Sequence, residues 1–447
     1  MNDLIGIGAS GIRAYRTALS TVAENTANVD TPGYTRRQTQ LKDIGATTGG
    51  DPYGTGSARQ GGVAVGAIAR VWDDFKAADA RLSSSDAARA ATRTEWLSAA
   101  ETALPDDDRG VGAKLTAVFS AATALSAGPN DMLARQTMVS TLDQAATGIR
   151  TAADALTRVG KGIGDQADTM AQGINDDLTA LGKVNLALAR ATPGTGAAAS
   201  LADERDRLLD GLSERIGIDT SFDAKGAVTV ALTGNAGTPL LSGGTRNAVA
   251  VERAADGRLA LSVRGDTVVA VVPTGGAMAG LVDAARQVAG SRTALDGIAA
   301  GFAAQVNGWN AAGTTPSGAA GGALLAGTDA ASLTLIAGVT GNAIAAGKDG
   351  IANGNAVAFA GFRGPDGAEA RIESLIGLNA QTLSASRSEA AATATRSDSA
   401  FAARDAVSGV DLDREASDLL RYQQAYSASA KVLQTARDTL ATILQLF

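Results

Sequence analysis

The chain contains neither cysteine nor histidine among its 447 residues. These two absences exclude a thiol nucleophile, a Ser-His-Asp triad and a metal site built on thiolate or imidazole ligands. Residues 6–11 formally match a dinucleotide-binding fingerprint, but the strand that must precede such a motif is missing. A mechanism based on carboxylates or lysine stays open on composition alone. The acidic run Asp106, Asp107 and Asp108 could bind a cation, but it lacks the spaced partners of a calcium loop, which favours a solvated loop. We expect no catalytic residue, no cofactor and no bound metal.

Aromatic residues make up only 4% of the chain, and the formal net charge is −7. A core must therefore be built mainly from alanine, leucine, valine and isoleucine. The negative charge argues against a nucleic-acid partner, which requires a basic face. No stretch approaches the roughly 20 apolar residues of a membrane span, and the first residues lack the basic and apolar regions of a cleaved secretory signal. We expect neither a nucleic acid nor a membrane as a partner.

Proline is absent from residues 1–31 and 366–447, so both chain ends are free to form helices. Apolar residues recur there every seven positions, in two rows at the N-terminal end and one at the C-terminal end: Ile5, Ile12 and Leu19; Tyr15, Val22 and Val29; and Leu412, Leu419, Tyr426, Leu433, Leu440 and Phe447. Ala416, Ala430 and Leu444 each lie four residues after a member of the C-terminal row. Such heptads predict that the ends pair as a coiled coil and form the assembly interface of the protein.

Between the ends, helical periodicity covers residues 71–104, 129–193, 280–312 and 366–408. Alternating apolar residues near 228–232 and 259–263, and an apolar run at 268–272, predict short strands. Residues 313–365 are rich in glycine and alanine and predict loops with short elements. The charged run at 203–207 predicts an exposed helix face with local ion pairs.

The predicted fold is mainly α with a β-rich insertion. We expect an inner coiled-coil domain of residues 1–30 plus 410–447 and a helical bundle domain of 31–215 plus 276–409. Residues 216–275 are expected to form a small outer β region. Pro32 and Gly33 stand at the second and third positions of a predicted type II turn, which ends the first helix and redirects the chain.

Both ends carry motifs of a known family. The N-terminal segment with Ser10-Gly11-Ile12 and Asn25-Thr26-Ala27-Asn28-Val29-Asp30-Thr31-Pro32-Gly33-Tyr34 resembles the signature shared by flagellar rod, hook and hook-associated proteins. The C-terminal segment with Ser408-Gly409-Val410-Asp411-Leu412-Asp413-Arg414-Glu415-Ala416, Leu420-Arg421-Tyr422-Gln423-Gln424-Ala425-Tyr426 and Ser429-Ala430-Lys431-Val432 resembles their C-terminal region. The chain looks most like the first hook-associated protein family, whose members join hook to filament.

That resemblance implies a structural role in which the paired terminal helices line an axial channel. It implies export by the flagellar type III apparatus, and a place outside the cell at the hook–filament junction after a cytoplasmic stage. The implied partners are further copies of the chain, the hook protein, a second junction protein and a cytosolic export chaperone at the C-terminal helix.

Three other interpretations compete. A flagellar hook protein or distal rod protein shares the N-terminal signature, although a hook protein should be richer in β structure after its first helix. A rod-associated enzyme that cleaves peptidoglycan requires a catalytic acid in a folded insert, and no such insert is visible. A cytoplasmic coiled-coil scaffold would not explain the N-terminal signature.

Overall fold

The computed structural model describes residues 2–44, 61–235 and 237–445. The chain forms two compact units, each built from separate stretches of sequence. Unit 1 contains Met1–Ser84, Ile174–Ala248 and Ala394–Phe447, and unit 2 contains Ser85–Gly173 and Val249–Thr393. Three long helices, α2, α4 and α8, run from one of these stretches into the next.

The helices of the described residues include most of the chain. They are α1 (Asn2–Ala27), α2 (Asp74–Ala103), α3 (Val111–Ala127), α4 (Met132–Arg190), α5 (Gly196–Arg215), α6 (Gly276–Ala311), α7 (Gly354–Ala358), α8 (Ala368–Ser408) and α9 (Leu412–Leu444). Two short 3₁₀ helices, η1 (Gly341–Ala343) and η2 (Phe359–Phe362), lie near α7 in sequence. The predictions of long helices over 71–104, 129–193, 280–312 and 366–408 are confirmed by α2, α4, α6 and α8.

The strands form small antiparallel sheets. They are β1 (Arg37–Asp43), β2 (Val63–Arg70), β3 (Ile218–Phe222), β4 (Val228–Leu232), β5 (Pro239–Ser242), β6 (Thr245–Arg246), β7 (Ala248–Arg253), β8 (Leu259–Arg264), β9 (Val268–Val271), β10 (Leu325–Ala326) and β11 (Thr334–Leu335). The sheet orders are β1-β2, β3-β4-β5-β6, β7-β8-β9 and β10-β11. The three strands predicted between 228 and 272 are confirmed as β4, β8 and β9.

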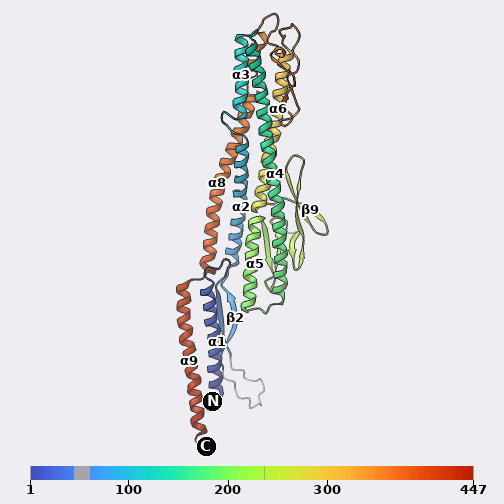
Figure 1. The fold of residues 1–447 in the computed structure, drawn as a ribbon. Helices are drawn as coiled ribbons and strands as arrows, with labels where there is room; N and C mark the ends of the chain where they lie inside the picture. The colour runs from blue at the N-terminus through green and yellow to red at the C-terminus, as the bar shows by residue number, and fades with distance from the viewer. Residues whose placement is uncertain (1, 45–60, 236, 446–447) are drawn as a thin grey trace. The chain divides into compact units, whose positions relative to one another are not determined.

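In unit 1, α1 and α9 lie side by side and antiparallel, with the hairpin β1-β2 next to α1 (Figure 1). The sequence analysis places residues from 31 onward in a helical domain and does not foresee these two strands at Arg37–Asp43 and Val63–Arg70. The signal of this hairpin is the alternation of Val63, Val65 and Ala67, and its strands pair in register from Arg37–Arg70 to Asp43–Val63 with one irregularity. Unit 1 also contains α5 and the sheet β3-β6.

Unit 2 is a bundle of long helices with the sheet β7-β9 (Figure 1). Its part of α4 carries the seven-residue row predicted from the sequence, and Leu142, Ile149, Leu156 and Ile163 are all fully buried. Of the two sheets in the 216–275 region, β3-β6 lies in unit 1 and β7-β9 lies almost wholly in unit 2. The coiled-coil character of the ends and the three predicted domains stay predictions.

The break between α8 and α9 has a local cause. The Gly409 amide donates to the Asp405 carbonyl, and a Cβ at Gly409 would lie 2.5 Å from that oxygen, so a larger residue does not fit there without movement. Asp411 then caps α9, since its side chain accepts hydrogen bonds from the amides of Asp413 and Arg414. With no glycine or proline after Gly409, α9 continues to Leu444.

Candidate assembly site at the joined chain ends

The joined chain ends begin with a close approach between α1 and α9. A Cβ placed on Gly8 would lie 3.2 Å from Leu433 and from the Ser429 carbonyl oxygen. A Cβ on Gly11 would lie only 2.5 Å from the Ser429 hydroxyl. The two glycines therefore allow the helix backbones to approach each other here, which larger residues at these positions would prevent.

The middle of the contact is a small apolar cluster. Ala18, Val22 and Tyr422 are buried in it, and Tyr15, Leu19 and Leu419 pack against it. The rings of Tyr15 and Tyr422 lie 6.4 Å apart between centroids in a tilted arrangement. Such an offset geometry is favourable for aromatic pairs.

The contact ends at a buried polar hub around Glu415, whose side chain is 1% exposed. One carboxylate oxygen accepts from the Arg36 Nε at 2.7 Å, and the other accepts from the Asn25 side-chain amide at 3.0 Å. Arg36 also reaches Asp418 at 3.1 Å. The hub joins the last turns of α1 to the first turns of α9, so it sets the axial register of the pair.

The side-chain amide of Asn25 forms four hydrogen bonds within this hub. Its NH₂ group donates to the Arg37 carbonyl and to Glu415, and its oxygen accepts from the Arg37 amide and the Tyr34 hydroxyl. Asn25 thus bonds both backbone groups of Arg37, the first residue of β1, as a residue of a neighbouring strand would. Burial raises the pKa of Tyr34 to about 12, against the opposing effect of Arg37.

The turn between α1 and β1 brings these groups together. Gly33 has a φ of +78°, and the Tyr34 amide donates to the Thr31 carbonyl at 3.1 Å. Pro32 and Gly33 therefore occupy the central positions of a hydrogen-bonded turn, with the positive φ that the third position of a type II turn requires. The turn directs Arg36 to Glu415 and Arg37 to α5.

The hairpin covers a second face of α1. The Ser10 hydroxyl accepts from the Val63 amide, and the Thr21 and Thr39 hydroxyls lie 2.9 Å apart in a buried hydrogen bond. The N-terminal motif thus serves two partners, since Gly8 and Gly11 face α9, Ser10 and Thr21 face the hairpin, and Asn25 contacts both.

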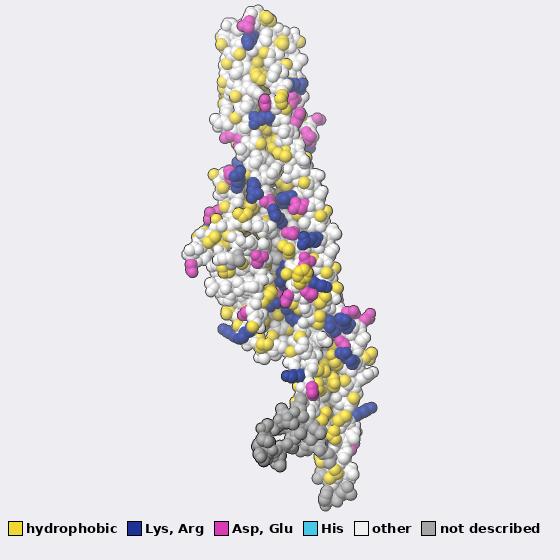
Figure 2. Space-filling view, turned by 180° about the vertical axis from the view of Figure 1, so that it is seen from behind, with side chains coloured by type: hydrophobic (Ala, Val, Ile, Leu, Met, Phe, Trp, Pro, Cys, Tyr) yellow, Lys and Arg dark blue, Asp and Glu magenta, His cyan; other side chains and the backbone are white. Residues whose placement is uncertain are grey.

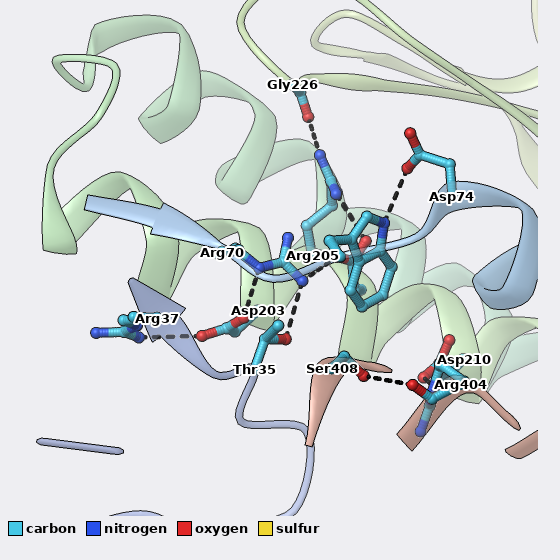
Figure 3. Close-up of polar contacts among 12 residues, drawn as sticks. Thr35, Arg37, Arg70, Asp74, Asp203, Arg205, Asp210, Gly226, Arg404 and Ser408 are labelled. Carbon is cyan, nitrogen blue, oxygen red and sulfur yellow. Dashed lines mark hydrogen bonds and ion pairs between the residues drawn. The ribbon is translucent and has the colours of Figure 1, made fainter. Parts of the chain in front are cut away.

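Beside the hub lies a buried set of ion pairs, called here the arginine–aspartate cluster, shown in part in Figure 3. Its members are Arg37, Arg70, Arg81, Arg205, Asp203, Asp206 and Asp210. Asp203 pairs with Arg37 at 3.0 Å and with Arg70 at 2.8 Å. Asp206 pairs with Arg70 at 2.6 Å, Arg205 at 2.8 Å and Arg81 at 3.2 Å.

The cluster extends to α8 and to the sheet of unit 1. Asp210 pairs with Arg81 and with Arg404, each at 2.8 Å. The Arg205 guanidinium donates to the Gly226 carbonyl and lies over the Phe222 ring. Burial lowers the pKa of Arg205, although Asp206 opposes that shift. The cluster therefore joins β1, β2, α2, α5 and α8 within unit 1.

The prediction of an exposed charged face at 203–207 is wrong for most of its residues. Asp203, Arg205 and Asp206 are all buried, and the two aspartates pair with arginines of β1, β2 and α2. The pair of Glu204 and Arg207 is local and exposed, as expected, whereas the local pair of Arg205 and Asp206 is buried. Buried charges must be paired to avoid a large desolvation cost, and the alternating charges of the cluster meet that requirement.

The residues predicted for the assembly interface take different positions. Tyr15, Leu19, Val22 and Leu419 belong to the apolar cluster or pack against it. Ile5, Ile12, Leu433 and Leu440 are half-buried, Leu412 is 51% exposed and Tyr426 is 36% exposed. Phe447 lies outside the described residues.

The face that α9 buries differs from the one predicted. Glu415, Tyr422 and Ala436 are the buried residues of α9 among those described, whereas Ala416 is exposed and Ala430 half-buried. The buried residues of α9 share a spacing of seven positions or its multiples. Their row lies one residue before the predicted row that contains Ala416 and Ala430. The predicted row of large apolar residues runs along the edge of the contact and stays partly open to solvent.

Within 2–44, 61–235 and 237–445, no group of three or more Asp or Glu side chains is placed to hold a metal ion. No helix in the described part of the chain is long and apolar enough to cross a membrane.

Comparison with known families gives three matches. The model of the flagellar hook-associated protein FlgK helical domain matches residues 97–325, just over half of the chain. A model of flagella basal body rod proteins matches residues 5–35. A model of the C-terminal part of the flagellar basal body rod FlgEFG proteins matches residues 405–446.

Individual proteins agree with these matches. Flagellar hook-associated protein 1 of Salmonella typhimurium is 29% identical over 260 residues, which is 57% of this chain and 46% of the relative. The same protein of Bacillus subtilis is 28% identical over 223 residues, 49% of this chain and 44% of the relative. The chain thus spans less than half the length of these curated relatives.

A solved structure shows a related fold. The flagellar hook junction protein FlgK from Burkholderia pseudomallei superimposes with a TM-score of 0.50 and 22% identity. The match covers 55% of this chain and 46% of that one, and at this identity it concerns the fold alone.

Proposed function

This chain belongs to the flagellar hook-associated protein FlgK family, and on that premise we propose that it joins the hook of the bacterial flagellum to the filament. Proteins of this family are structural and are not enzymes. In this role the chain works outside the cell, at the hook–filament junction, after a cytoplasmic stage.

The observation that carries the proposal is the agreement between the family matches and the joined ends. The two rod-protein models match residues 5–35 and 405–446, and these are the segments that meet at the hub. Asn25 and Arg36 come from the first end of the chain and Glu415 from the other. The helical domain match over 97–325 favours a hook-associated protein over a hook or distal rod protein, which is the second candidate.

We propose that assembly occurs through the terminal helices. The apolar row of α9 is only partly covered by α1, and Leu412, Leu420 and Tyr426 stay open to solvent. Hydrophobic side chains gather over the terminal helices on the face seen in Figure 2. Exposed apolar surface of this kind is buried favourably when further copies of the chain pack against it.

Two further parts of the proposal concern neighbours and export. The hook protein would contact one side of the junction layer and a second hook-associated protein the other. Export would use the flagellar type III apparatus, with a cytosolic chaperone covering α9 beforehand. The exposed apolar residues of α9 support such a chaperone contact, because they need cover before assembly.

The test is a gene deletion followed by electron microscopy of the cells. Intact hooks without filaments, with flagellin in the medium, are expected. Missing hooks would favour the hook or rod candidate, and normal flagella would contradict a flagellar axial role.

Complementation of the deletion strain then tests the terminal helices. Leu433→Asp places a charge at the half-buried edge of the α1–α9 contact and should abolish incorporation. Gln434→Asp adds the same charge at the next, exposed position and should restore filaments. Normal junctions with Leu433→Asp would contradict assembly through this pair.

A further inference from the structure

Helix α8 changes character along its length. Its first part is held by large apolar side chains, since Ile372 and Leu383 are both fully buried. Residues 384–400, by contrast, contain no apolar side chain larger than alanine. The buried residues of that stretch are all small: Ser386, Ser397 and Ala400. We call residues 384–400 the α8 strap.

The α8 strap lies between two anchor points. Before it, Leu383 is buried inside unit 2. After it, Arg404 pairs with Asp210 of α5 at 2.8 Å, and the Ser408 carbonyl accepts a hydrogen bond from the Arg36 amide at 2.9 Å. The strap can therefore move away from its neighbour while both ends of it stay attached.

The neighbour of the strap is α2, which runs beside α8 (Figure 1). The contacts between them include ion pairs of Glu389 with Arg93 at 2.7 Å, Arg387 with Glu101 at 3.4 Å and Arg396 with Asp79 at 3.7 Å. The strap's own members of these pairs are between 46% and 56% exposed. Ion pairs that keep contact with water contribute little to stability and are screened by salt.

A groove of 550 Å³ lies where the strap begins. Residues of α2, α6 and α8 line it, among them Leu97, Gln287 and Ala385. Protein interiors normally leave few gaps of this size between helices. The packing against α8 is therefore already incomplete at the first turn of the strap.

We propose that the α8 strap detaches from α2 while its two anchor points stay folded, and that ionic strength sets how often it does so. Detachment uncovers little apolar surface of the strap, because its buried side chains are serine and alanine, so the hydrophobic effect opposes the movement only weakly. The partly exposed ion pairs then decide whether the strap stays closed, and salt weakens them. The inference does not rest on the proposed junction function.

The absence of cysteine allows detachment to be measured by thiol labelling. Ser397→Cys places a single thiol at a strap position that is 8% exposed. The purified full chain is treated with N-ethylmaleimide, an uncharged reagent, in about 0.01 M and about 1 M salt, between which the Debye length falls from about 30 Å to about 3 Å. We expect labelling to be roughly tenfold faster at the higher salt concentration. Equal rates at the two concentrations would overturn the proposal.

Two control variants separate detachment of the strap from other effects of salt. Ala153→Cys in α4 is 7% exposed and matches the burial of Ser397, but it lies among large apolar residues and should be labelled slowly at both concentrations. Ser399→Cys stands at an exposed position of the strap and gives the reactivity of a free thiol there. If Ala153→Cys accelerates with salt as much as Ser397→Cys does, the opening is global and the strap is not a separate element.

Removal of the ion pairs provides a second measurement. Glu389→Gln combined with Arg396→Gln, added to Ser397→Cys, breaks two of the pairs at partly exposed positions. Labelling at low salt should then approach the rate that Ser397→Cys alone shows at high salt. Glu373→Gln, at an exposed position of α8 before the strap, is the matched control and should leave the rate unchanged. A low-salt rate that the double substitution does not alter would contradict control of the strap by its charges.

Discussion

Replacement of Asp206 by alanine is expected to destabilise unit 1 strongly. Asp206 is 4% exposed and accepts from three arginines, Arg70, Arg81 and Arg205. Alanine would leave these guanidinium groups buried with fewer acceptors. Arg70 retains Asp203 and Arg81 retains Asp210, so the remaining partners offset part of the loss.

The magnitude follows from the loss of one member of a buried ionic set. Removing one partner of a buried ion pair costs about 3–5 kcal/mol, because the other charge stays buried without compensation. Glu204→Ala, on the same helix, is the matched control. Glu204 pairs with Arg207 at the surface, and exposed pairs contribute about 0–1 kcal/mol.

Hydrogen exchange followed by mass spectrometry suits this prediction, because it reports on unit 1 separately from unit 2. Amides of α5 should exchange on the order of 100-fold to 1,000-fold faster in Asp206→Ala, since about 1.4 kcal/mol corresponds to a tenfold change. Amides of α6 in unit 2 should be unaffected. Unchanged protection of α5 in Asp206→Ala, or an equal effect of Glu204→Ala, would refute the role assigned to the cluster.

Three further predictions concern the joined ends. Glu415→Gln turns one acceptor oxygen into a donor facing Arg36 or Asn25, and it should destabilise α9 by about 2 kcal/mol, measured as faster amide exchange in α9. Gly11→Leu should cost about 1–3 kcal/mol by urea denaturation through overpacking, whereas Gly6→Leu, with no atom within 4 Å of its Cβ, should not destabilise the chain. The pKa of Tyr34 is about 12 in the folded chain, against an ordinary value of 10.0. The neutral buried phenol therefore contributes fully to the free energy of unfolding below pH 10, and this contribution is lost as the pH rises toward 12. Urea denaturation of Tyr34→Phe at pH 9 and 11 should show a smaller alkaline loss of stability than the unchanged chain, and an equal loss would contradict the buried phenol.

The parts of the fold set by periodicity could be predicted from the sequence. The row Leu142 to Ile163 in α4 was visible as a spacing of seven, and the structure buries all of it. A long helix inside a bundle has one inner face, so its large apolar residues mark that face directly. The strand at Val228–Leu232 was visible for the same reason, because its apolar residues alternate.

The inner face of α9 could not be predicted in the same way. Large apolar residues mark every surface that becomes buried, including those that another copy would cover. The contact with α1 depends instead on Gly8 and Gly11, which permit a close approach and carry no hydrophobic signal of their own. For this reason the buried row of α9 lies beside the predicted one.

The buried polar groups were missed for a different reason. Charged residues such as Asp206 and Glu415 are usually exposed, so sequence patterns assign them to the surface. Their burial depends on partners far away in the chain, which local spacing does not reveal. The adjacent Arg36 and Arg37 after the turn were a usable signal, because they follow a motif that directs the chain back along α1.

The hub between Asn25 and Glu415 also has a consequence for the order of folding, since these residues are 390 positions apart. The ribosome adds Glu415 to the chain 390 residues after Asn25, so α1 lacks this partner until then. Closing so long a loop carries an entropy cost, which slows the formation of contacts of high sequence separation. Local helices of unit 2 can form much earlier. We therefore expect the contact between α1 and α9 to form after the local helices of unit 2.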